Sequence, residues 1–250
     1  MWNQTVPLLN KEHYQKTVLA CFIQFWTFYA AHGLFMWFPY ILNKVMQFTN
    51  ENPSARLEIC DIVYSMVEKT RNIQFNGTDG VFETERGCDR VLELSTYKHS
   101  ISHEVIYVSS FLCIGFLTGK VGRSPTLFTI LFVCGVCGVL SAVITTPMVA
   151  IYFHIILLVA GLATTVVNIT VVDIYPTNFR AMAVCISLMI GRIGSVTGTN
   201  VVGMLMENYC KTSLLTASIP VIICAFLSLL LPSGMNSKKM KKINYNDPTS

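Results

Sequence analysis

The residues best suited to chemistry are polar side chains that lie inside long apolar runs. Arg192 stands between Gly191 and Ile193, about 11 residues from the start of its run. An ionised side chain at that depth in a membrane is costly and usually faces a bundle interior or a water-filled cavity. We expect Arg192 to line a substrate path, and the alternative is an arginine kept for stability alone.

Four other side chains are candidates for the same cavity. Trp26, Tyr29 and His32 lie deep in the first apolar run, and Tyr29 and His32 are three residues apart on one helix face. Asn168 belongs to a polar stretch within another run, at residues 164–170. For the aromatic residues the alternative is helix packing, and for Asn168 it is a hydrogen bond to a neighbouring helix.

Enzymatic, metal and cofactor chemistry find little support in the chain. Cys134 and Cys137 have CxxC spacing, but they lie in the middle of an apolar run with no second pair at metal-ligand spacing. His99 and His103 are four residues apart without the glutamate of a zinc-protease helix. We find no phosphate loop or nucleophile elbow. We expect no enzyme, metal or cofactor.

The elements that position these residues are predicted to be membrane helices. Of the 250 residues, 52% are hydrophobic and only 13% are charged, against about 25% charged in soluble domains. Apolar runs of about 20 residues are long enough to span a bilayer. Six occur, at 17–42, 99–118, 126–144, 148–172, 181–206 and 214–231. The fold class is therefore all-α, a multi-pass transmembrane bundle.

The distribution of charge orients this bundle in the lipid bilayer. Lysine and arginine gather at one side, in segment 1–16, at two helix ends and in the tail 232–250, which predicts cytoplasmic termini around the 17–231 bundle. The large loop at 47–101 holds six Lys+Arg and nine Asp+Glu and is predicted to be luminal or extracellular. The net charge of +4 forms no basic face, so nucleic-acid binding is not expected.

Two further features of the large loop fit an exterior position, and a third indicates local structure. Asn76 begins an Asn-Gly-Thr glycosylation sequon in polar surroundings. Cys60 and Cys88 could form a disulfide in an oxidising compartment, and the alternative is two free thiols. Residues 57–67 have a short helical pattern, which allows a small folded cap.

Two predicted cytoplasmic segments carry charged motifs. The turn after the second span contains Gly115, Lys120, Gly122 and Arg123, in which small residues allow close helix approach and cations anchor the headgroup region. The alternative is an ordinary basic loop.

The fourth span ends with an acid and an arginine seven residues apart, Asp173 and Arg180, around Pro176. Proline terminates or kinks the helix there. We expect Asp173 and Arg180 to pair as a latch that biases a conformational equilibrium.

These two motifs, two helices apart in a six-helix unit, resemble the C-terminal half of major facilitator superfamily transporters. Gly115, Lys120, Gly122 and Arg123 match the loop signature G-x-x-x-D-R/K-x-G-R-R, with Gly119 where the family has an acid. The run DIYPTNFRAMAVCISLMIGRIGSVTGTN resembles the synaptic vesicle glycoprotein 2 group, in which a large loop between the seventh and eighth helices is typical.

The resemblance implies transport of a small solute, such as an organic ion, by alternating access. In that fold the substrate lies near the midplane between two six-helix halves. This chain then needs a complementary half or a second copy, and the plasma membrane or a vesicle membrane would hold it. The alternative is a non-transporting membrane or vesicle protein that binds a partner through residues 47–101.

Overall fold

A computed structural model describes residues 11–52, 57–76, 94–175 and 177–231, and every regular element among them is helical. The α-helices are α2 (Lys11–Glu51), α3 (Ile59–Asn76), α4 (Leu94–Lys120), α5 (Arg123–Ser141), α6 (Pro147–Leu158), α7 (Ala163–Ile174), α8 (Thr177–Asn208) and α9 (Cys210–Ser228). A short 3₁₀ segment, η2 (Val159–Leu162), joins α6 to α7, so these three elements make one continuous span.

Six helical spans in the described residues are long and apolar enough to cross a membrane. This confirms the all-α, six-span prediction, and the chain is an integral membrane protein. The predicted boundaries were less accurate, because α2 continues from Leu42 to Glu51 and α4 begins at Leu94. At about 1.5 Å per residue, the 41 residues of α2 extend well beyond a hydrocarbon core of about 30 Å.

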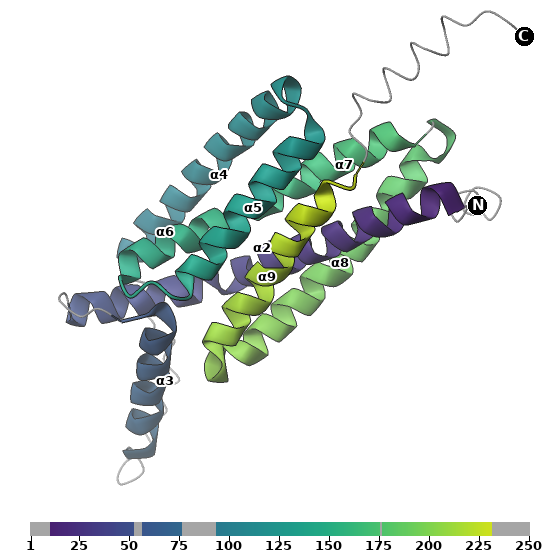
Figure 1. The fold of residues 1–250 in the computed structure, drawn as a ribbon. Helices are drawn as coiled ribbons and strands as arrows, with labels where there is room; N and C mark the ends of the chain where they lie inside the picture. The colour runs from purple at the N-terminus through teal and green to yellow at the C-terminus, as the bar shows by residue number, and fades with distance from the viewer. Residues whose placement is uncertain (1–10, 53–56, 77–93, 176, 232–250) are drawn as a thin grey trace, which may run out of the picture.

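The closest helix pair consists of α2 and α8, which lie side by side along much of their length (Figure 1). Glycines on α8 make this approach possible. A Cβ atom at Gly194 would collide with the Phe25 carbonyl oxygen, and one at Gly198 would lie 2.5 Å from the carbonyl oxygen of Tyr29. In lipid, small residues permit the backbone proximity that stabilises helix pairs through van der Waals contact.

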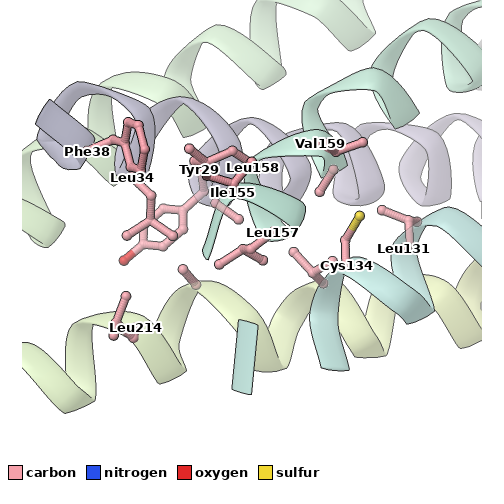
Figure 2. Close-up of a cluster of buried hydrophobic side chains, with 14 of the residues drawn as sticks. Tyr29, Leu34, Phe38, Leu131, Cys134, Ile155, Leu157, Leu158, Val159 and Leu214 are labelled. Atoms are coloured by element: carbon pink, nitrogen blue, oxygen red, sulfur yellow. The ribbon is translucent and has the colours of Figure 1, made fainter. Parts of the chain in front are cut away.

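The buried core fills the space between α2, α5, α6 and α9. Figure 2 shows side chains from these helices and from η2 pointing into one cluster: Tyr29, Leu34, Phe38, Leu131, Cys134, Ile155, Leu157, Leu158, Val159 and Leu214. Helix α4 takes little part in this core and lies at the edge of the bundle (Figure 1). The cavities of the candidate site lie between α4 and α2.

Helix α3 leaves the end of α2 and projects from the bundle (Figure 1). Its Ile59, Ile62, Val63 and Met66 are buried at the three- and four-residue spacing of one helix face. The helical pattern predicted for 57–67 is therefore present, and the helix continues to Asn76.

Candidate functional site

The predicted exterior end carries a disulfide, but its pairing is not the Cys60–Cys88 bond that the sequence allows. Cys60 bonds to Cys210, with their Cα atoms 5.5 Å apart, so Cys60 is not free to pair with Cys88. The physical reason is spatial, because the first turn of α3 lies against the start of α9. Cys88 lies outside the described residues, and so do the side chain of Asn76 and the other two residues of its glycosylation sequon.

Two polar contacts surround this disulfide. The backbone N–H of Cys210 donates to the Tyr64 hydroxyl at 3.0 Å, and the Lys211 ammonium donates to a Glu58 carboxylate oxygen at 3.0 Å. These contacts attach the first half of α3 to α9, and we call the set of Cys60, Cys210, Glu58, Lys211 and Tyr64 the clasp.

At the opposite, predicted cytoplasmic end, Arg123 forms an ion pair with Asp173. The same guanidinium donates to the Ile169 carbonyl oxygen at 3.2 Å. Arg123 begins α5 and Asp173 lies one residue from the end of α7, so this pair joins the α4–α5 turn to the end of the fourth span. Both side chains are partly exposed.

The Asp173–Arg180 latch is therefore wrong in its second member. No ion pair joins Arg180 to Asp173 among the described side chains, and the buried Nε of Arg180 has no hydrogen-bond partner there. Arg180 lies on the next helix, α8, whereas Arg123 contacts Asp173 in the last turn of α7 directly.

The glycines of the first motif do not share one role. Gly122 adopts φ +107°, a backbone conformation that L side chains rarely adopt, and it makes the turn between α4 and α5. A Cβ atom at Gly115 or Gly119 would meet nothing within 4 Å, so close packing is not their role in this arrangement. Lys120 folds back over the Phe116 ring at 4.5 Å.

Exchanging the charges of Arg123 and Asp173 tests the pair. Each single reversal, Arg123→Asp or Asp173→Arg, is expected to reduce any transport activity, and the double exchange to recover part of it. An exposed pair contributes only about 0–1 kcal/mol to stability, but about 1.4 kcal/mol shifts a two-state equilibrium tenfold. The measurement is uptake by vesicles at equal protein level. Asp173 paired with Arg180 instead would be indicated if only the Asp173–Arg180 exchange restored activity.

Three residues of the polar stretch in the fourth span form hydrogen bonds within the bundle. The Gln24 amide of α2 donates to the Asn168 side-chain oxygen at 3.2 Å, while Thr164 and Thr170 bond to carbonyls of their own span. Asn168 thus makes the interhelical bond that was the alternative to substrate contact. Gln24, which is fully buried, was missed because it stands alone among aromatic residues.

Arg192 lies on the exposed side of α8, next to α2. Its guanidinium carbon lies 5.6 Å from the centre of the Phe28 ring, and Phe28 stacks on His32 at 4.8 Å. Arg192 also interacts electrostatically with His32. The six-helix unit by itself leaves this charge uncovered in the middle of a span.

Two cavities lie between α2 and α4. The larger has a volume of about 750 Å³ and is lined mainly by apolar side chains. The smaller, of about 210 Å³, is lined in part by His32 and Tyr107. Both cavities share Phe35, His103 and Glu104, so they meet at these three residues.

The five residues that were predicted to line one cavity do not lie together. His32 lines the smaller cavity, whereas Trp26 and Tyr29 line neither cavity; they pack against each other at 5.3 Å, and Tyr29 is part of the buried core (Figure 2). Asn168 and Arg192 also lie outside both linings. The two residues predicted to share a face therefore differ, because Tyr29 is buried in the core and His32 lines a cavity.

Four ionisable residues that line these cavities were not predicted to do so: Tyr97, His103, Glu104 and Tyr107. His154 of α6 lies behind them in the core, where it stacks on Phe38 at 5.8 Å, and neither of its ring nitrogens has a hydrogen-bond partner among the described residues. Glu104 did carry a signal, because it is an acid seven residues into a span.

One titratable side chain lies just outside the spans at the predicted cytoplasmic end. The Tyr175 hydroxyl hydrogen-bonds with the Thr17 hydroxyl at 2.5 Å, and burial raises the pKa of Tyr175. Tyr175 therefore remains protonated at neutral pH and connects the end of α7 to the start of α2.

Comparison with known proteins found no protein-family model and no curated protein that matches the chain.

Proposed function

We propose that the chain is one six-helix half of a secondary transporter, which moves a small solute across the membrane by alternating access. The observation that carries this proposal is the pair of connected cavities between α2 and α4, with Glu104, His103 and His32 in their walls. Ionisable residues within membrane spans are costly and are typical of substrate or ion paths. The major facilitator resemblance of the two loop motifs supports the same function.

The polar contacts at the two ends support an orientation for this transporter. The Cys60–Cys210 disulfide needs an oxidising compartment. The Arg123–Asp173 pair lies at the other end of the bundle, where the basic residues also gather. We therefore place the termini in the cytoplasm, the clasp on the exterior or luminal side, and the protein in the plasma membrane or a vesicle membrane.

A second six-helix unit belongs to the proposal. Arg192 is exposed near the middle of α8, where an arginine facing lipid costs from about 2.5 kcal/mol upward. Helix α4 is also largely exposed, with only 6% of its most apolar stretch buried among the described residues. A complementary half or a second copy of this chain would cover both, so we expect no transport by the isolated monomer.

The test is uptake of radiolabelled small organic ions by vesicles from cells that express the chain. Arg192→Ala is expected to reduce uptake at least tenfold at equal protein level. The substitution removes a positive charge that lies near His32 of the smaller cavity and on the surface that a second six-helix unit would cover. Lys211→Ala, a cation change in the exposed clasp, is the matched control and is expected to retain most uptake.

Equal uptake by the Arg192→Ala vesicles and the unmodified vesicles would contradict a role for this arginine. Uptake no greater than that of vesicles lacking the chain, for every solute in the series, would favour the non-transporting alternative. In that case residues 47–101 would be tested for partner binding.

A further inference from the structure

The two cavities meet at a negatively charged side chain, Glu104, which lines both of them. Among the described spans, Glu104 is the acidic residue that lies inside a span and not at its end. Its carboxylate contacts the His103 ring nitrogen Nδ1 at 3.2 Å, and no lysine or arginine pairs with it among the described side chains. The carboxylate is 63% exposed, so it is accessible from the cavities.

His103 holds this carboxylate in place. Its side chain is only 4% exposed, and its Nδ1 lies on the ring edge that faces Glu104. When Nδ1–H donates to the Glu104 carboxylate, the imidazole is neutral and Nε2 carries its lone pair on the opposite edge of the ring. Nε2 is buried and has no hydrogen-bond partner in the described part of the chain, so the acceptor that the cavities expose is the carboxylate of Glu104.

The remaining walls favour an apolar body. Phe35 and Phe38 contact the His103 ring, at centroid distances of 5.7 and 5.4 Å, and both line the larger cavity. Val108 and Leu112 of α4 also line it. Aromatic faces within about 6 Å attract cations as well as apolar groups.

The other charged and titratable groups nearby do not cancel the charge of Glu104. His32 and Tyr107 face the smaller cavity, and His154 lies beyond Phe38 in the core. Arg192 lies beside Phe28 and His32, outside both linings, and neither lining contains a lysine or an arginine. The larger cavity therefore combines a carboxylate, which His103 holds, with apolar walls.

We propose that the cavity between α2 and α4 binds a protonated amine with an apolar body, whose ammonium N–H groups donate to the Glu104 carboxylate. The apolar body lies against Phe35 and Phe38. A metal ion fits less well, because no three His, Cys, Asp or Glu side chains among the described residues are grouped to hold one. An anion would meet the carboxylate without a compensating lysine or arginine. This inference rests on the proposed transport function, since it names the solute class for the same cavity.

The experiment is equilibrium binding of tritiated 2-phenylethylamine to the purified full chain in nanodiscs of zwitterionic lipid, at neutral pH. Unlabelled 2-phenylethylamine is expected to compete best, its trimethylammonium derivative less well because it has no N–H, and 2-phenylethanol at least tenfold more weakly because it has no charge. This series uses the unmodified chain, so it decides the question even if a variant fails to fold.

Two variants test the assigned groups. Glu104→Gln is expected to weaken amine binding at least tenfold, whereas Glu68→Gln, the same change on the exposed face of α3, leaves it unchanged. His103→Phe keeps an aromatic ring and removes the Nδ1–H that holds the Glu104 carboxylate, so it should weaken amine binding less than Glu104→Gln does and leave the order of the three competitors unchanged.

Equal competition by the amine and the alcohol, or unchanged amine binding in folded Glu104→Gln, would overturn the inference. Failure of the proposed function is measured separately by vesicle uptake. Amine binding without uptake of any solute would retain the site and reject transport. Uptake of another solute without amine binding would retain transport and reject this site.

Discussion

Replacing Gly194 with alanine is expected to cause a large loss of folded protein, although it adds one methyl group. The new Cβ atom would collide with the backbone carbonyl oxygen of Phe25, which cannot rotate away as a side chain could. Helices α2 and α8 would have to separate, and theirs is the most extensive helix contact in the bundle. Overpacking of a close contact typically costs about 1–3 kcal/mol, and a rigid backbone partner favours the upper part of that range.

The matched control is Gly119→Ala on α4. A Cβ atom at Gly119 would meet nothing within 4 Å, and glycine to alanine at an open helical site is expected to stabilise by about 0.4–1 kcal/mol. The measurement is the thermal midpoint of each variant in detergent, followed by tryptophan fluorescence. Gly198→Ala should behave like Gly194→Ala, and equal midpoints for all three variants would contradict the packing argument.

The six spans could be predicted because burial in lipid imposes a simple requirement on sequence. Each span needs about 20 apolar residues, and that requirement does not depend on which helix packs against which. The helix boundaries do not follow from the same rule. Helix α2 continues through Asn43, Lys44 and Gln47, where polar residues form helix outside the predicted apolar run.

The contact partners could not be predicted, because they depend on how distant elements meet. Cys60 and Cys210 are 150 residues apart, so the nearer Cys88 was the natural candidate. Likewise, Asp173 was assigned to the arginine seven residues away, whereas the structure pairs it with Arg123, 50 residues earlier. Sequence proximity was the common error in both assignments.

The residues of the α2–α4 cavity were only partly recoverable. His32 was found from its depth in an apolar run. Glu104 was missed although an acid within a span is costly, because the histidines beside it do not have the pattern of a metal site. His103 and His154 look like ordinary span residues until helix packing shows that His103 Nε2 and both ring nitrogens of His154 lack hydrogen-bond partners among the described residues.

The second large effect is expected from the disulfide. Cys60→Ser should detach α3 from the bundle end and lower the thermal midpoint, because removal of a native disulfide typically costs about 2–5 kcal/mol. The rest of the clasp cannot replace it, since the Glu58–Lys211 pair is partly exposed and such pairs contribute about 0–1 kcal/mol. The spans stay in the membrane when unfolded and already restrict the chain, which favours the lower part of the disulfide range.

Cys88→Ser is the control for this effect, and it distinguishes the two pairings directly. A protease site inserted after Gly80 divides the chain into two fragments, one with Cys60 and the other with both Cys88 and Cys210. After cleavage, the fragments of the otherwise unmodified chain and of Cys88→Ser are expected to migrate as one band until a reductant is added. Those of Cys60→Ser and Cys210→Ser should separate without it. Separation in Cys88→Ser together with linkage in Cys210→Ser would restore the Cys60–Cys88 pairing and contradict the clasp.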